Sequence, residues 1–204
     1  YGVYVEVALM MGAELIPVET SLESNFTIDV EVLAAAITPK TKALIIVTPN
    51  NPTGTVIPEE TLRQIAALAV ERDLIVISDE IYEDYVFADH KHVSMATLPG
   101  MRERTISLYS LSKGYALTGV RIGYIVAPPE LTKAMLAFHH AMTICANSIA
   151  QYGAAAALSQ PRDWFSPILQ EYDRRRKLWM NMLGDCGLGY AEPQGAYYLA
   201  IDIR

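Results

Sequence analysis

The chain has 204 residues, 51% of them hydrophobic, which is enough to bury one sizeable core. Its formal net charge is −7 and it has no long run of like charge, so nucleic acid is not expected as a partner. The sequence has no apolar stretch long enough to span a bilayer and no recognisable signal peptide, and it therefore predicts no membrane association and a cytoplasmic location. Cys145 and Cys186 have no metal-type spacing and are expected to be buried free thiols, with a disulfide between them as the alternative.

Short apolar runs rich in β-branched residues alternate with longer helical patterns, which is typical of an α/β sheet covered by helices on both faces. The pattern predicts helices at about 3–11, 29–36 (with Asp29 as the cap), 58–73, 129–142, 148–158 and 167–183. It predicts strands at 14–19, 43–47, 74–78, 105–109 and 123–127. After the break "GDCGLG" at 184–189, the segment "GYAEPQGAYYLAID" is expected to form two strands of a different layer.

Polar clusters follow three of the predicted strands. "TPNNPTG" at 48–54 follows "ALIIV", "DEIY" at 79–82 follows "LIVIS", and "SLSK" at 110–113 follows "TISLY". In open α/β sheets, ligands bind at the edge formed by the carboxyl ends of the strands. The three clusters together therefore predict one shared pocket.

Lys113 is the residue in these clusters that could act as a nucleophile. An ordinary lysine has a pKa near 10.4, so only about one in 2,500 is a free amine at neutral pH. A nucleophilic lysine needs an apolar site or a cationic neighbour such as Arg121, and a phosphate bound by Arg121, Ser110 and Ser112 would balance the two cations. Asp79 needs a cation or a strong donor at the end of an apolar strand. Pyridoxal 5′-phosphate has the aldehyde, the phosphate and the basic ring nitrogen that these groups require.

The motifs "NNPTG", "DEIY" and "SLSKGYALTGVRIG", in this order and spacing, resemble those of the class I/II aminotransferases, the aspartate-aminotransferase-like group of fold type I. The resemblance extends over essentially the whole chain. It implies a three-layer αβα large domain with a mostly parallel sheet over residues 1–183, ending in a long interdomain helix. Residues 184–204 would then be the first strands of a smaller C-terminal domain. Because the chain begins at Tyr1 rather than Met and ends at Arg204, just after an apolar run, we expect a fragment of a longer protein. The resemblance implies that the longer protein forms a homodimer.

The resemblance also implies roles for individual residues. Lys113 would form a Schiff base with pyridoxal 5′-phosphate and then carry a proton between the substrate Cα and the cofactor C4′. Asp79 would keep the ring nitrogen protonated. Tyr82 and Asn51 would hydrogen-bond the phenolic oxygen of the ring, and Asn51 would also lie near the substrate carboxylate. The remaining implied cofactor-binding residues are Ser110, Ser112 and Arg121 at the phosphate and Tyr1 stacked on the ring.

The resemblance also implies which parts of the site lie outside this chain. The family's glycine-rich phosphate turn and an aromatic residue from the partner subunit would precede Tyr1. The arginine that binds the substrate α-carboxylate would follow Arg204.

The predicted function is therefore a pyridoxal-phosphate-dependent aminotransferase that moves the amino group of an L-amino acid to a 2-oxo acid. A carbon–sulfur lyase or other eliminating enzyme of the same fold remains an alternative, as does a catalytically silent domain. The sequence does not identify the amino donor.

Each proposed site residue also has a simpler interpretation. Lys113 could be an ordinary loop lysine, Asp79 the cap of a helix that starts at Glu80, residues 51–54 only a turn, Tyr82 a packing residue, and Arg121 the partner of a carboxylate. The four histidines (His90, His92, His139 and His140) are predicted to be surface or core residues without a metal. Tyr197 and Tyr198 are expected on alternate faces of a strand, with no assigned role.

Overall fold

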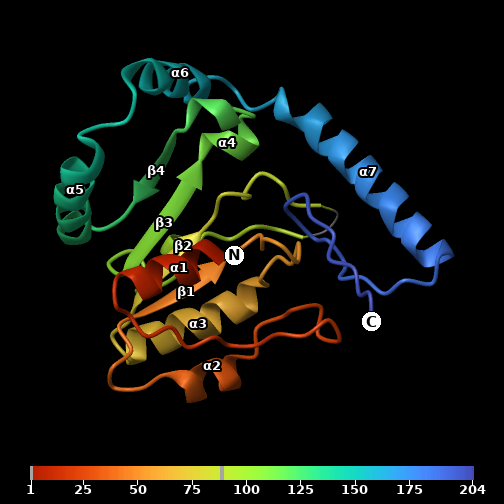
Figure 1. Ribbon diagram of the computed structural model, residues 1–204, viewed down its shortest axis with the longest axis horizontal. Coiled ribbons are helices and arrows are strands. Elements are labelled where there is room, and N and C mark those ends of the chain that lie inside the picture. The colour runs from red at the N-terminus through yellow and green to blue at the C-terminus, as the bar shows by residue number, and fades with distance from the viewer. Residues whose placement is uncertain (1, 88–89) are drawn as a thin grey trace.

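The computed structural model spans the chain and describes residues 2–87 and 90–204 (Figure 1). Within these residues, the strands form one sheet in the order β1-β2-β3-β4. Their bounds are β1 Ala43–Val47, β2 Ile75–Asp79, β3 Thr105–Ser110 and β4 Gly123–Val126. β1, β2 and β3 are parallel, and β4 runs antiparallel to β3. The predicted fold class, an α/β chain with a mostly parallel sheet, is confirmed.

The register of the sheet brings the three predicted strand ends together. Val47 of β1 lies opposite Asp79 of β2, and Asp79 lies opposite Leu108 of β3. The three strands are parallel, so the segments that follow them leave the same edge of the sheet.

The main core lies between the sheet and helix α3 (Glu59–Glu71). Leu62 and Ile65 of α3 are fully buried and belong to one cluster with Leu44, Ile46 and Val76 of β1 and β2. The helix begins after Pro58 with two acidic residues, which favour the positive end of the helix dipole. Helix α2 (Val30–Ala36) packs beside it and has the predicted cap, because the Asp29 carboxylate accepts hydrogen bonds from the backbone of residues 31 and 32.

Two sets of predicted strands are absent from the described structure. Residues 14–19 are irregular; Pro17 has no backbone N–H to donate to a neighbouring strand. In the C-terminal segment, the two expected strands are reduced to isolated bridges, Tyr190–Ile201 and Val86–Gly195. The backbone N–H groups of residues 194–196 donate to carbonyls of Gly54 and Tyr85 instead, so the segment is tied to loops at the sheet edge.

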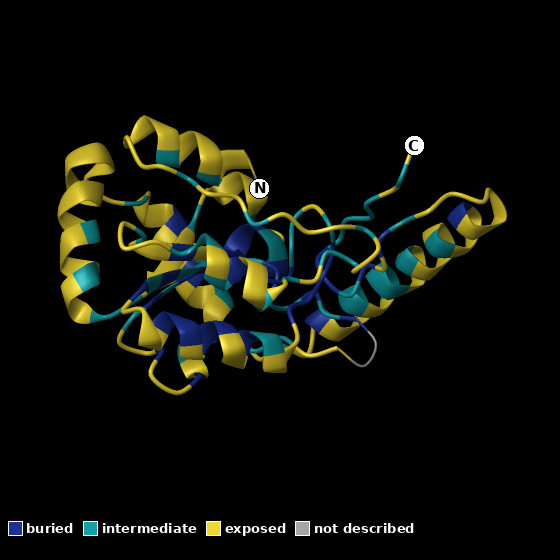
Figure 2. Ribbon diagram, turned by 90° about the horizontal axis from the view of Figure 1, so that it is seen from below, coloured by how far each residue is buried: buried dark blue, intermediate teal, exposed yellow. Residues whose placement is uncertain are grey.

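Several of the remaining helices are largely exposed, as Figure 2 shows for α5. Helices α1 (Gly2–Met10) and α5 (Pro129–Thr143) contain no buried residue, and on α5 Leu136 and Phe138 are 62% and 57% exposed. Among the described residues, no helix combines the length and the apolar character needed to cross a membrane. The other helical elements are α4 (Leu111–Gly114), α6 (Ser148–Leu158), α7 (Phe165–Asp185) and the 3₁₀ turns at Met95–Thr97 and Thr118–Val120.

The cysteine prediction is half right. Cys145 and Cys186 are free thiols, as expected, but both are exposed rather than buried. Cys145 lies in the short link between α5 and α6, and Cys186 directly follows α7, so neither is in a position that packs against the sheet.

Candidate active site

A cavity of about 140 Å³ lies at the strand ends. Four of the predicted site residues line it: Asn51, Asp79, Tyr82 and Lys113. They come from the loop after β1, the end of β2, the loop after β2, and α4 after β3. Ile81 and Tyr198 complete the described lining. The shared pocket predicted from the three motifs is therefore present.

Lys113 is held on the short helix α4. The Ser110 hydroxyl oxygen caps this helix by accepting a hydrogen bond from the Ser112 backbone N–H at 3.1 Å. The Lys113 ammonium lies 5.5 Å from the ring centroid of Tyr197 and 5.9 Å from that of Tyr82. Both distances fall within the range of cation–π attraction. The lysine is thus a half-buried residue of an aromatic cavity rather than an ordinary loop lysine.

A side chain on the residue after the lysine would have to displace Asp84. A Cβ atom on Gly114 would lie 2.0 Å from the Asp84 carboxylate oxygen. Asp84 is fixed by an ion pair with Arg162 at 2.6 Å, and the Arg162 guanidinium lies 4.3 Å from the ring centroid of Tyr115. This group of side chains supports α4 on the side next to Lys113.

Asp79 is almost fully buried, at 3% exposure. Burial raises the pKa of its carboxyl, and hydrogen bonds donated by the Tyr4 hydroxyl and the Ile81 backbone N–H offset part of that effect. No helix begins at Glu80, so the simple capping interpretation is wrong. A buried carboxylate of this kind is suited to a cationic ligand atom.

The contact between Tyr4 and Asp79 was not predicted from the sequence. Tyr4 lies on helix α1, three positions along the chain from the predicted stacking residue Tyr1. Tyr1, the predicted stacking residue, lies outside the described residues.

Asn51 lies in a tight turn, so the turn interpretation is correct, but the same residue also lines the cavity. Gly54 closes this turn with a φ of +74°, which favours glycine. The Gly54 carbonyl accepts hydrogen bonds from Gln194 and Gly195. The loop after β1 is thereby joined to the C-terminal segment.

The three predicted phosphate ligands are not among the residues that line this cavity. Ser110 caps α4, and Ser112 is largely buried within it. Arg121 is exposed and donates a hydrogen bond to the Thr118 carbonyl at 2.9 Å rather than to a carboxylate. The phosphate-binding role of these residues stays a prediction.

Glu80 is a fully buried carboxylate that faces a different set of side chains. One of its oxygens accepts from the Ser94 and Ser107 hydroxyls at 3.0 and 3.3 Å, and the other contacts His92 Nε2 and the Tyr109 hydroxyl at 3.1 and 3.0 Å. Burial by itself would raise the pKa of Glu80. His92 lowers this pKa through its hydrogen bond and its charge, and the Ser94 hydroxyl lowers it through a second hydrogen bond. Together these effects exceed the effect of burial, so the pKa of Glu80 is lowered.

His92 is half-buried against this network, and the ligand atoms of Glu80, Glu83 and His92 all lie within 4.8 Å of one another, so the three side chains form a group that could hold a metal ion. The absence of a metal at the histidines stays a prediction.

Glu83, next to this cluster, is expected to make stability depend on pH. Burial, followed by the charge of Asp84, raises the pKa of Glu83 from 4.5 to about 7. The folded state then keeps a proton that the unfolded state loses, so stability is lost as pH rises between these two values. Glu83→Gln mimics the protonated form; we expect it to match the parent protein at about pH 4 and to be more stable at about pH 8, as measured by urea unfolding. An equal difference at both pH values would contradict this.

Comparison of the sequence with models of protein families identifies the family to which the chain belongs. The family model described as "Aminotransferase class I and II" matches residues 1–204. The chain belongs to this family. Among its relatives, an aspartate aminotransferase of Pyrococcus abyssi is 43% identical over 96% of this chain and 51% of its own length. The aromatic-amino-acid aminotransferase 2 of Thermococcus litoralis is 41% identical over the same shares. The chain spans about half the length of these aminotransferases.

Solved aminotransferase structures have the same fold. The aromatic aminotransferase from Pyrococcus horikoshii OT3 superposes with a TM-score of 0.96 at 41% identity, covering 100% of this chain and 55% of that one. The aspartate aminotransferase from Thermus thermophilus with maleate gives a TM-score of 0.94 at 38% identity, covering 98% and 52%. The predicted membership of the class I/II aminotransferases is thus confirmed.

Proposed function

We propose that this chain carries the cofactor-binding lysine and its partners in a pyridoxal-phosphate-dependent aminotransferase. The enzyme would move the amino group of an L-amino acid to a 2-oxo acid. The observation that carries the proposal is the convergence of Lys113, Asp79, Tyr82 and Asn51 on one cavity. The activities for which similar proteins are named, which include aspartate, aromatic and arginine–pyruvate transamination, support it.

The side chains of the cavity fit the chemistry of this cofactor. Pyridoxal phosphate supplies an aldehyde that condenses with amines and a ring that takes up electrons from the substrate. Asp79, buried and matched to a cationic atom, would hold the proton on the ring nitrogen. Tyr82 would donate its hydroxyl proton to the phenolic oxygen, and Asn51 would donate its amide N–H to the same oxygen. Ser110, Ser112 and Arg121 would bind the phosphate.

Lys113 has two tasks in this proposal. Its amine must lose a proton to attack the aldehyde, and the partial burial of the side chain reduces the hydration that would stabilise the ammonium. Once released, the same nitrogen would take a proton from the substrate Cα and return it to the cofactor C4′. A side chain that reaches the cavity from a capped helix can serve both carbon atoms without a change in the backbone.

Half-reactions test the proposal directly. The complete polypeptide is loaded with pyridoxal phosphate and mixed separately with L-aspartate, L-tyrosine and L-arginine, and pyridoxamine phosphate and the 2-oxo acid are measured. We expect both products in equal amounts from at least one donor. Pyruvate and ammonia from cystathionine without an acceptor would favour the lyase instead. A protein that binds no pyridoxal phosphate would contradict the proposal and favour a silent domain.

The organisation of the complete protein is part of the same proposal. Residues 1–183 would belong to the large domain and residues 184–204 to the start of a smaller one, although α7 extends to Asp185. The complete polypeptide would act as a cytoplasmic homodimer on small-molecule amino acids and 2-oxo acids.

A further inference from the structure

The hydroxyl oxygens of Tyr82 and Tyr198 lie 2.6 Å apart and share a hydrogen bond between residues that are 116 positions apart. Their rings meet edge to face with centroids separated by 5.6 Å. Tyr82 belongs to the motif that follows β2, whereas Tyr198 belongs to the C-terminal segment, where the sequence suggested no role. Both line the cavity that contains Lys113.

The C-terminal segment holds Tyr198 firmly in this position. The Gly195 N–H donates to the Gly54 carbonyl at 2.7 Å, and the Ala196 N–H donates to the Tyr85 carbonyl at 2.8 Å. A Cβ atom on Gly195 would lie 2.7 Å from the same Tyr85 oxygen, so the backbone approaches closely here. The position of Tyr198 is therefore set by the hydrogen bonds of the neighbouring backbone.

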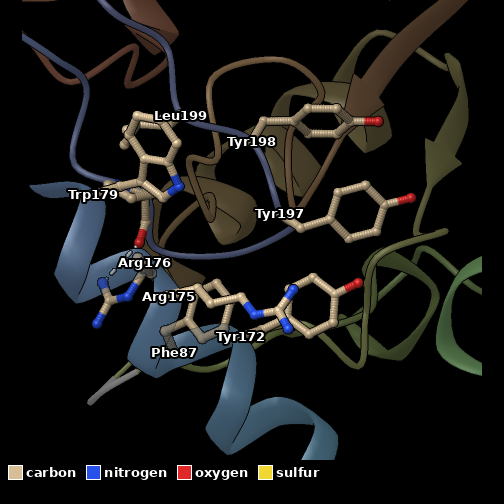
Figure 3. Close-up of a pocket in the computed structure, with 9 residues that line it drawn as sticks. Phe87, Tyr172, Arg175, Arg176, Trp179, Tyr197, Tyr198 and Leu199 are labelled. Atoms are coloured by element: carbon tan, nitrogen blue, oxygen red, sulfur yellow. Dashed lines mark hydrogen bonds between the residues drawn. The ribbon is translucent and has the colours of Figure 1, made fainter.

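Tyr198 forms a wall between two cavities. Its ring also lines a second cavity of about 180 Å³, together with Tyr197, Trp179 and Phe87. Figure 3 shows that the hydroxyls of Tyr197 and Tyr198 both point away from Trp179. The apolar ring of Tyr198 therefore faces one cavity while its hydroxyl faces Tyr82.

The hydrogen bond between the Tyr82 and Tyr198 hydroxyls can run in either direction. Each phenol carries one proton, so only one of the two donates in their shared hydrogen bond. If Tyr82 donates, its only proton is used within the pair. If Tyr198 donates, the Tyr82 proton is free to point into the cavity. Burial, followed by the hydrogen bond with Tyr198, raises the pKa of Tyr82, so Tyr82 keeps its proton over the working range of pH.

We propose that Tyr198 is a positioning residue, which donates to Tyr82 and so directs the Tyr82 proton into the cavity toward an anionic oxygen of the bound ligand. This rests on the proposed function, in which that oxygen belongs to the ring of the cofactor. An anionic oxygen cannot donate, so Tyr82 must donate to it and must in turn accept from Tyr198. Hydrogen bonds linked in such a chain strengthen one another.

A pair of non-covalent ligands tests the proposal without relying on turnover. The first ligand is 4′-deoxypyridoxine 5′-phosphate, which has the phenolic oxygen but no aldehyde, and the second is the same compound without that oxygen. We expect Tyr198→Phe to weaken binding of the first ligand about 3- to 10-fold and of the second less than about 2-fold, because one hydrogen bond is weakened. Tyr82→Phe should weaken the first ligand at least as much.

Two further variants complete the design. In Tyr82→Phe/Tyr198→Phe, the loss should equal that of Tyr82→Phe alone, because Tyr198 acts through the Tyr82 hydroxyl. Tyr172→Phe makes the same chemical change on α7, in the same aromatic cluster, and should leave both affinities unchanged. Circular dichroism of each variant checks that the fold is retained.

The results distinguish a failure of the role proposed for Tyr198 from a failure of the proposed function. If Tyr198→Phe weakens both ligands equally, or adds to the loss in Tyr82→Phe, then Tyr198 only packs and the inference is wrong while the proposed function stands. If neither the parent protein nor any variant binds these ligands, the proposed function fails and the inference fails with it.

Discussion

Lys113→Arg is expected to abolish the covalent capture of pyridoxal phosphate. The guanidinium of arginine stays protonated at every accessible pH and cannot condense with an aldehyde, although it keeps the positive charge next to Tyr82 and Tyr197. After borohydride reduction, the parent protein should carry the cofactor on the peptide that contains Lys113. In the variant, labelling should fall to the background of exposed lysines, of which only about one in 2,500 is a free amine at neutral pH.

Lys133→Arg is the matched control because Lys133 is an exposed lysine on α5. It should leave the labelling of Lys113 unchanged. Peptide mass spectrometry of both digests gives the measurement. Labelling spread evenly over the lysines of the parent protein, with no preference for Lys113, would remove the basis for assigning the nucleophile.

Of the proposed substitutions, Glu80→Ala is expected to lower the free energy of unfolding the most. The substitution removes a fully buried carboxylate and leaves the Ser94, Ser107 and Tyr109 hydroxyls without their acceptor. Each buried donor left unsatisfied costs about 1–3 kcal/mol, so the total loss should be on the order of 3 kcal/mol or more. Urea unfolding near neutral pH measures it.

The effect of Glu80→Ala should also depend on pH. The pKa of Glu80 is lowered in the folded state, so its contribution is present above the ordinary value of 4.5 and is lost as pH falls through the folded value. The difference between variant and parent protein should therefore shrink in acid. Glu103→Ala, in an exposed turn before β3, should change stability by less than about 0.5 kcal/mol. Equal losses in the two variants would show that the buried network contributes little.

Local patterns were sufficient for the elements that form the centre of the sheet. The runs at 43–47, 74–78 and 105–109 are short, apolar and rich in β-branched residues, and each forms a strand within one residue of its predicted bounds. The pattern failed where a strand needs a partner that local sequence does not specify. Residues 14–19 have strand-like composition, but Pro17 interrupts them and no neighbouring strand pairs with them in the described structure.

The sequence by itself determined the family, through its three motifs. It also determined which side chains meet in the cavity, because Asn51, Asp79, Tyr82 and Lys113 lie at or just after strand ends that are visible in the apolar pattern. Only the tertiary structure decided which partners those side chains have. Tyr4 reaches Asp79 across 75 positions and Tyr198 reaches Tyr82 across 116, and His92 turns inward to Glu80. The physical reason is that buried polar groups must find donors or acceptors, and packing rather than neighbouring sequence determines which ones come within reach.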